Sequence, residues 1–240
     1  MENKLIKHLL LVHKQAVNLV PEKPVSSDFQ GAKSPKPHTE SGFSLLEVLV
    51  VMVIISILGG IAVPTWLGFV NNQKLQTSIR RLNWAIHSTK SEAILSSTSW
   101  QASIREYGGQ VQVAVHPAKT PPGQLPEGSW TSLEPGIEIH NREKNSRGKY
   151  ETTLRRVDPD TNQVRNAGTV YRVLFNHQGC PVYNPSSFCT ENSPGAKGRI
   201  ALHHPEVPGQ KRCIIISTLI GATRIGQQQQ RPNQNGYYCH

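Results

Sequence analysis

An apolar run over residues 43–63 starts abruptly and carries a glutamate, Glu47, four residues after its first phenylalanine, Phe43. With a rise of about 1.5 Å per residue, a run of about twenty residues forms a helix that matches the hydrocarbon core of a bilayer. A carboxylate inside a membrane costs a few kcal/mol, which makes such a residue a functional candidate. The run therefore predicts a transmembrane helix over 43–63 in which Glu47 has a role.

The segment before this run, residues 1–42, is rich in lysine and proline and predicts a cytoplasmic leader that is removed. In an ordinary secretory signal the small residue at the cleavage site follows the apolar region, whereas here Gly42 comes before it. Cleavage after Gly42 removes the basic leader and leaves the apolar helix on the mature chain. The alternative is a disordered basic N-terminus with an ordinary linker glycine.

The helix is expected to continue beyond the apolar run, over residues 43–98. Pro64 predicts a kink, because proline lacks a backbone donor and its ring clashes with the preceding turn. Beyond it, apolar residues recur at helical spacing and predict one buried face, formed by Leu75, Ile79, Leu82, Ile86 and Ala93. The first half of this helix suits lipid or tight helix packing, and the second half suits a soluble domain laid against one side.

Short β-like runs follow from Trp100 onward, separated by segments rich in proline and glycine. The runs cover residues 110–116, 137–140, 150–157, 170–175, 199–204 and 212–218. They predict an α+β fold in which a mostly antiparallel sheet packs on the amphipathic half of the helix. We expect a β-rich globular head over residues 99–240 that ends in a polar tail.

Four cysteines, Cys180, Cys189, Cys213 and Cys239, all lie in the C-terminal quarter of the chain. An even number of cysteines, without a CxxC pair, favours disulfides over a zinc or redox site if the domain lies outside the cytosol. Three pairings are possible. The favoured one joins Cys180 to Cys189 across a short loop and Cys213 to Cys239, which ties the tail to a core strand. Buried free thiols are the alternative.

The stretch "GFSLLEVLVVMVIISILGGIAVP" resembles the class III signal and transmembrane helix of type IV pilins and type II secretion pseudopilins. The resemblance implies a pilin-like fold and cleavage after Gly42 by a prepilin peptidase, which then methylates the new N-terminal amine of Phe43. It implies that Glu47 aligns the subunit in a growing filament and that Pro64 distorts the helix. The implied location is the bacterial inner membrane, with a single span and the head in the periplasm, and later the pilus or pseudopilus.

A physical reason for the role of Glu47 follows from this cleavage. Phe43 then carries a positive amine, about one helical turn from the Glu47 carboxylate. Opposite charges attract strongly in a medium of low dielectric constant, whereas each charge alone is costly to bury. An unpaired Glu47 therefore favours docking beside the free amine of a neighbouring subunit. The alternative is an acid that sits at the interface of an isolated single-span protein without a role.

The last part of the chain is similar to the GspH/FimT branch of minor pilin-like proteins, in the stretches "VLFNHQGCP", "GRIALHH" and "RCIIISTLIGATRIG". This resemblance implies a minor structural subunit that joins or primes a type IV pilus or a type II secretion pseudopilus. Its implied partners are the prepilin peptidase, other pilin or pseudopilin subunits and the inner-membrane assembly platform.

DNA is a further implied partner, because the FimT branch is associated with DNA uptake. The chain has a formal net charge of +10, and Arg212, Arg224 and Arg231 are candidate phosphate contacts. The stretch that matches the DNA-associated Gly-Arg-x-Arg segment reads Gly221-Ala222-Thr223-Arg224, so one of its two arginines is absent. A solvated basic surface is the alternative.

No catalytic motif is present in the sequence, which contains no phosphate-binding loop, no GxSxG and no HExxH. His203 and His204 are adjacent, so in a strand they point to opposite faces and cannot share a metal. We therefore expect neither an enzyme nor a cofactor or metal site. A single-span anchored binding protein that never assembles is the remaining alternative.

Overall fold

The computed structural model describes residues 42–141, 143–145, 147–189, 197–216 and 220–240, and within them it leaves out the side chains of 61–65. The predictions for leader residues 1–41 lie outside the described residues. The chain divides into two units, Met1–Leu49 and Val50–His240. In the first unit the described part is short and contains the start of the long helix. The second unit holds the rest of the helix and all strands.

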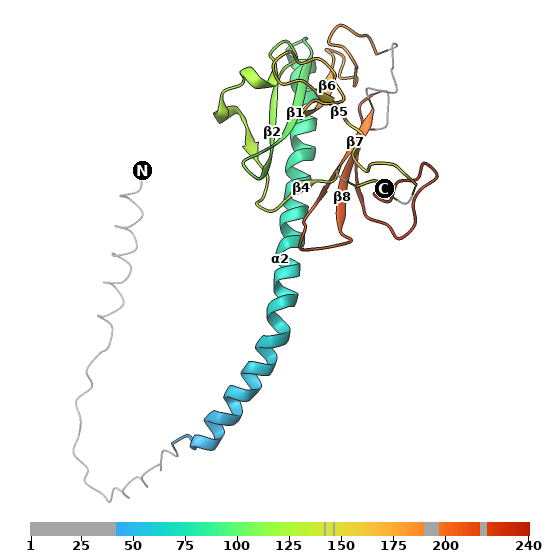
Figure 1. The fold of residues 1–240 in the computed structure, drawn as a ribbon. Coiled ribbons are helices and arrows are strands. Elements are labelled where there is room, and N and C mark those ends of the chain that lie inside the picture. Colours follow the sequence, from blue (N-terminus) through green and yellow to red (C-terminus); the bar gives the residue numbers. More distant parts are fainter. Residues whose placement is uncertain (1–41, 142, 146, 190–196, 217–219) are drawn as a thin grey trace, which may run out of the picture. The chain divides into compact units, whose positions relative to one another are not determined.

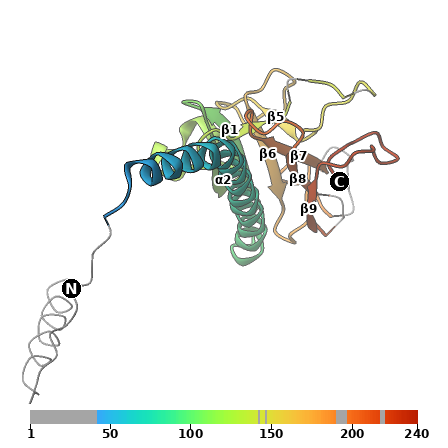
Figure 2. The ribbon, with the colours of Figure 1, turned by 90° about the horizontal axis from the view of Figure 1, so that it is seen from below.

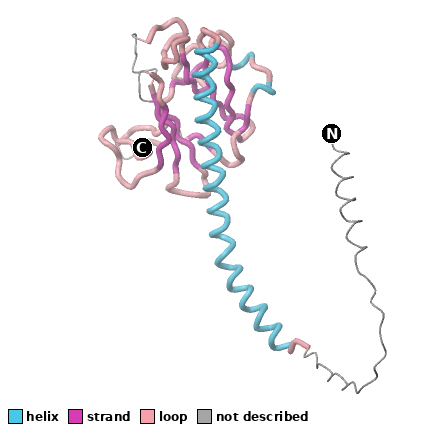
Figure 3. The backbone as a smooth tube through the Cα atoms, turned by 180° about the vertical axis from the view of Figure 1, so that it is seen from behind, coloured by secondary structure: helices cyan, strands magenta, loops and turns pink. Residues whose placement is uncertain are grey.

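The long helix α2 spans Leu45–Leu95, slightly shorter at both ends than the predicted range. Its predicted apolar face is confirmed, because the side chains of Leu75, Ile79, Leu82, Ile86 and Ala93 are all at most 1% exposed. They form one hydrophobic core with residues from both sheets of the head. Figure 3 shows α2 running across the strands.

The first sheet has five strands in the order β3-β2-β1-β6-β5, and all of its pairs are antiparallel. The strands are β1 Trp100–Tyr107, β2 Gln110–Pro117, β3 Thr131–Ser132, β5 Arg155–Val157 and β6 Val170–Phe175. Two short 3-10 helices, η1 Pro122–Gln124 and η2 Glu127–Ser129, lie between β2 and β3. Alternation along β2 turns Val111 and Val113 toward the core.

The second sheet has four strands in the order β4-β7-β8-β9, again antiparallel throughout. These strands are β4 Glu138–Ile139, β7 Gly198–His203, β8 Lys211–Ile216 and β9 Thr223–Gln227. Figures 1 and 2 show strands of both sheets beside the C-terminal half of α2. The predicted α+β fold, with a helix followed by antiparallel sheets, is confirmed.

The head is fastened to α2 by polar contacts as well as by the core. The Arg81 guanidinium donates to the carbonyl of Ser132 at 2.8 Å and pairs with Glu134 at 3.2 Å. On the other side of the helix, Lys90 Nζ donates to the carbonyl of Ile220 at 2.6 Å. These contacts join α2 to both sheets and fix its second half within the head.

Two disulfides are present, Cys180–Cys189 and Cys213–Cys239, and they are the pairs that the sequence favoured. Cys213 and Cys239 are fully buried with Ala201 and Ile215 on the face of β7 and β8 that is turned away from the helix core. The second disulfide thus ties the C-terminal tail to a central strand of the second sheet.

Candidate functional site

The junction between the leader and the helix is exposed and non-helical. Gly42, Phe43 and Ser44 precede the first turn of α2, and the Phe43 side chain is 79% exposed. Among the described residues, no atom outside the chain neighbours of Gly42 lies within 4 Å of the position that a Cβ on Gly42 would take. A peptide that is exposed and non-helical is available to a protease, whereas a helical peptide would first have to unwind.

Glu47 lies in the first turn of α2, with its side chain exposed. The Ser44 carbonyl accepts hydrogen bonds from the backbone N–H groups of Glu47 at 3.0 Å and Val48 at 3.2 Å, which makes Ser44 the N-cap residue. A carboxylate in this turn interacts favourably with the positive end of the helix dipole. The sequence analysis missed the role of Ser44, although Ser44 and Glu47 have the S-x-x-E spacing of a capping box.

The first half of α2 presents large apolar side chains on all its sides. Fifteen described residues, from Leu45 through to Phe69, are 45–83% exposed: Leu45, Leu46, Val48, Leu49, Val50, Val51, Met52, Val53, Ile54, Ile55, Ile57, Leu58, Trp66, Leu67 and Phe69. Contiguous apolar surface of this kind marks an interaction surface. Within the part of the chain that the structure describes, no helix is identified as long and apolar enough to span a membrane.

Pro64 lies inside α2, and its side chain is outside the described residues. A helical interior is where proline removes a backbone hydrogen bond. The predicted kink at this residue stays a prediction.

The three arginines considered for DNA binding do not form one row. In the β8–β9 pair Arg212 is opposite Gln227, and Arg224 is opposite Ile215. Because side chains alternate along a strand, Arg212 and Arg224 lie on opposite faces of the second sheet. Arg212 also donates to Gln227 Oε1 at 2.8 Å, while Arg231 is exposed in the tail.

A buried ionic cluster, which the sequence analysis missed, holds the tail against the second sheet. The Glu151 carboxylate, 1% exposed, accepts hydrogen bonds from the backbone N–H groups of Tyr238 at 2.8 Å and Cys239 at 3.3 Å. Arg199 pairs with Glu151 at 3.9 Å, donates to the Cys239 carbonyl at 2.7 Å and lies over the Tyr237 ring. Burial lowers the pKa of Arg199, and the charge of Glu151 opposes this shift. No sequence spacing signals such a pair.

Three histidines of the head, His140, His203 and His204, lie near the end of β7. His140 and His203 meet edge to face, with ring centroids 5.1 Å apart, and His204 is buried beside them in sequence. Burial, followed by the charge of Lys211, lowers the pKa of His140. In the described residues, His, Cys, Asp and Glu side chains form no group of three or more that is placed to hold a metal ion.

A comparison with protein families finds the prokaryotic N-terminal methylation motif at residues 37–63. This match spans the junction at Gly42, the exposed Phe43 and the first turn with Glu47. No curated protein and no solved structure matches the chain.

The motif supports a type IV pilin-like protein that is a substrate of prepilin peptidase and assembles with other pilins. It indicates a structural, membrane-anchored subunit rather than an enzyme. The motif covers residues 37–63 and therefore carries no information on the head or on the branch of pilin-like proteins to which the chain is most similar.

Proposed function

We propose that this chain is a minor pilin-like structural subunit that is cut between Gly42 and Phe43 and methylated on the amine of Phe43. Its helix α2 then joins the core of a type IV pilus or a type II secretion pseudopilus. The observation that carries the proposal is the exposed, non-helical Gly42–Phe43 peptide, directly ahead of a helix whose first turn holds Glu47.

The proposed cleavage creates a positively charged amine that can pair with the Glu47 carboxylate. Removal of residues 1–42 places a new cationic amine on Phe43, next to the N-cap residue Ser44 and directly before the helical turn that holds the Glu47 carboxylate. An unpaired carboxylate costs about 3 kcal/mol at the centre of a bilayer on insertion scales. Pairing with the amine of a neighbouring subunit would offset this cost, and it would fix the axial position of one helix against the next.

The two halves of α2 suit different surroundings. The second half is fixed to the head by its buried face and by Arg81 and Lys90. The first half exposes apolar side chains on every side, which suits first a lipid bilayer and then the neighbouring helices of a filament. We therefore infer a single membrane span over 43–63, with the leader in the cytoplasm and the head in the periplasm. The resemblance of the C-terminal stretches to the GspH/FimT branch supports the further proposal that the chain helps to initiate or tip the filament with the inner-membrane assembly platform.

The test replaces Glu47 with glutamine and uses Glu92→Gln as its matched control. Both side chains are exposed on α2, and Glu92 lies near the opposite end of the helix. Mass spectrometry of the mature N-terminus measures processing, and immunoblotting of sheared filaments measures incorporation. We expect the wild type and both variants to begin at methylated Phe43. We expect Glu47→Gln alone to be lost from filaments.

Two outcomes contradict the proposal. A wild-type protein that keeps residues 1–42 would overturn the processing step. Equal amounts of Glu47→Gln and Glu92→Gln in the filaments would overturn the role of Glu47 in assembly.

A further inference from the structure

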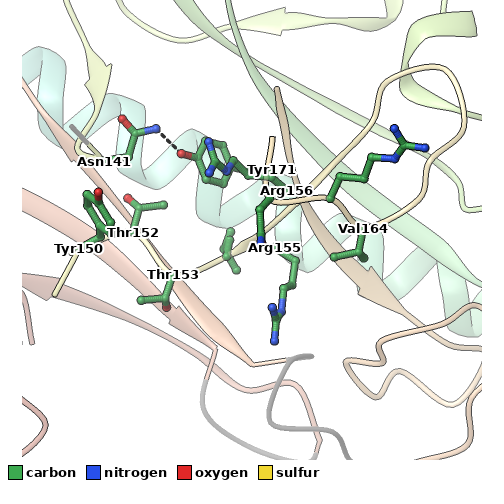
Figure 4. A pocket seen from close by; sticks show the side chains of 11 residues that line it. Asn141, Tyr150, Thr152, Thr153, Arg155, Arg156, Val164 and Tyr171 are labelled. Carbon is green, nitrogen blue, oxygen red and sulfur yellow. Dashed lines mark hydrogen bonds between the residues drawn. The ribbon is translucent and has the colours of Figure 1, made fainter. Parts of the chain in front are cut away.

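A cavity of about 380 Å³ opens between the two sheets of the head, away from α2. One wall comes from β5 and from Tyr171 on β6, both in the first sheet. The other wall is the segment of residues 150–154, which lies beside β7 of the second sheet. Thr153 and Leu154 donate their backbone N–H groups to the carbonyl of Arg199 on β7, at 2.8 and 3.1 Å. Figure 4 shows Tyr150, Thr152 and Thr153 on the side of the cavity opposite Arg155 and Arg156.

The lining combines cations with neutral hydrogen-bonding groups. Three arginines border the cavity, Arg155, Arg156 and Arg165, and its lining by described residues includes no aspartate or glutamate. Residues with amide or hydroxyl side chains make up most of the remaining lining: Asn141, Asn166, Tyr150, Thr152, Thr153 and Tyr171. The hydroxyls of Thr152 and Thr153 also accept hydrogen bonds from the backbone N–H groups of Ala201 and Arg199 on β7, each at 3.1 Å. The Asn141 amide donates to the Tyr171 hydroxyl, which fixes the orientation of both side chains.

The positive charge of this cavity is only partly balanced by the protein. Arg165 lies 4.0 Å from Asp158, at a site where both side chains reach solvent. Among the described residues, no carboxylate lies within ion-pair distance of Arg155 or Arg156. Arg155 instead approaches the ring of Tyr183, at 5.9 Å from its centroid. Arg156 is paired with Tyr171 in the β5–β6 ladder, so its side chain lies on the same face of the sheet as Tyr171, and among the described residues it has no anionic partner. Arg155, the next residue in β5, borders this cavity and also a second one, with Thr153 and Arg199.

The shape and chemistry of the cavity fit a small, polar ligand. Pockets for small ligands typically enclose about 300–1,000 Å³, and this cavity falls in the lower part of that range. Guanidinium groups bind planar or tetrahedral oxyanions through paired N–H donors. The amides and hydroxyls around them both donate and accept, as the hydroxyl groups of a saccharide require.

We propose that this cavity binds a hydroxyl-rich small anion of the class of acidic sugars. The anionic group lies against Arg155 and Arg156, and the ligand hydroxyls face Asn166 and Tyr150. None of the lining residues belongs to α2, so the proposal is independent of the role of Glu47 in assembly. The shared chemistry is one oxyanion beside vicinal hydroxyls, which either a uronic acid or a sugar phosphate supplies.

Isothermal titration calorimetry on the full mature chain in detergent micelles tests this proposal. The probes are glucuronate, glucose 6-phosphate, glucose and a mixed-sequence single-stranded oligonucleotide. We expect at least one of the two acidic sugars to bind and glucose to bind at least about tenfold more weakly, because a hydrogen bond to a charged group is worth more than a neutral one. The stronger of glucuronate and glucose 6-phosphate identifies the source of the oxyanion.

Arg156→Gln is expected to weaken the binding of the acidic sugar by about tenfold or more. Arg80→Gln is the matched control, because Arg80 is exposed on α2, outside the cavity lining, and it removes the same charge. Circular dichroism checks the fold of each variant. If Arg156→Gln does not fold, the same titrations are made with Arg155→Gln and Asn166→Ala, whose side chains are exposed and border the cavity. Weaker binding of the acidic sugar by these variants is then the expected result.

Several results would overturn the proposal: no heat of binding with either acidic sugar, glucose bound as tightly as they are, or equal affinity in Arg156→Gln and Arg80→Gln. Binding of the oligonucleotide alone, with a steep loss of affinity as salt rises, would assign the cations to a polyanion instead. Glucuronate carries one negative charge and glucose 6-phosphate about two, far fewer than the oligonucleotide, so the affinity of either should fall less steeply over the same range of salt.

Discussion

Removal of the Cys213–Cys239 disulfide is expected to destabilise the head more than removal of Cys180–Cys189. The perturbations are two double variants, Cys213→Ala with Cys239→Ala, and Cys180→Ala with Cys189→Ala. The two cross-links differ in the length of chain that they close, with sequence separations of 26 and 9 residues. They also differ in burial, because Cys213 and Cys239 are fully buried, whereas Cys189 is half-buried.

The chain-entropy account of a disulfide gives the magnitude of each effect. Closing a loop of 26 residues stabilises the folded chain by about 3.5 kcal/mol at 25 °C, and a loop of 9 residues by about 2.6 kcal/mol. Loss of Cys213–Cys239 also loosens the tail, whose backbone N–H groups at Tyr238 and Cys239 are bound by Glu151. The difference between the two double variants should therefore be about 1 kcal/mol or more.

Urea unfolding of the purified protein, followed by tryptophan fluorescence, measures the two free energies of unfolding. Differential alkylation under a mild reductant, read by mass spectrometry, measures the order in which the disulfides open. We expect Cys180–Cys189 to open first, because the reductant reaches the half-buried Cys189 sulfur more easily. A greater loss of stability in the Cys180–Cys189 variant, or earlier reduction of Cys213–Cys239, would refute this reasoning.

Two further predictions concern a buried histidine and a buried turn. His116 is 3% exposed, its Nε2 lies 2.9 Å from Ser103 Oγ, and burial lowers its pKa from 6.5. Near and below pH 6.5 the unfolded chain therefore binds more protons than the folded chain. The free energy of unfolding should fall as the pH drops from about 7 to 5. His116→Gln should flatten this slope in pH-dependent urea titrations, and an unchanged slope would contradict the assignment. Gly221 has φ of +66°, and a Cβ there would lie 2.6 Å from Phe175 Cε1, whereas the Cβ position of Gly109, with φ of +74°, is open. Both Gly→Ala changes cost about 1 kcal/mol for the left-handed backbone, and Gly221→Ala should cost about 2 kcal/mol more for overpacking; equal melting temperatures would count against the steric reason.

The elements that were predicted well from the sequence are those whose pattern is local. The buried face of α2 repeats at helical spacing, so Leu75, Ile79 and Leu82 could be assigned without knowledge of the sheets that cover them. The predicted ranges of β2, β6, β7 and β8 agree with the structure to within a residue or two, and three of these strands, β2, β6 and β8, are rich in β-branched residues.

The elements that were missed depend on contacts between distant segments. The strand β1 was not assigned, although it is central in the first sheet, because its buried Gln101 and Ser103 break the apolar pattern. These side chains are satisfied by His116 from β2, which no local rule predicts. The predicted strand over residues 150–157 was too long: only Arg155–Val157 is β5, because the preceding residues leave the first sheet to pair with β7.

The same crossing explains why the sequence did not reveal the cavity. Arg155 and Arg156 are neighbours, so a strand pattern alone sends them to opposite faces. Both border the cavity, and Arg155 also borders a second one; the change of sheets immediately before them brings Tyr150 and Thr153 to the facing wall. The cavity forms where segments of the two sheets meet, and the spacing of its lining residues along the sequence matches no known motif.

The separation of the two proposed sites gives each a control for the other. Glu47 lies in the first turn of α2, whereas the cavity is lined only by residues between Asn141 and Tyr171, none of which belongs to the helix. Effects at sites without shared contacts are normally additive. Glu47→Gln should therefore bind acidic sugars as the wild type does, and Arg156→Gln should enter filaments normally. If either variant impaired both properties, the head and the first turn of α2 would have to be coupled through assembly, and the two roles could not be assigned to separate residues.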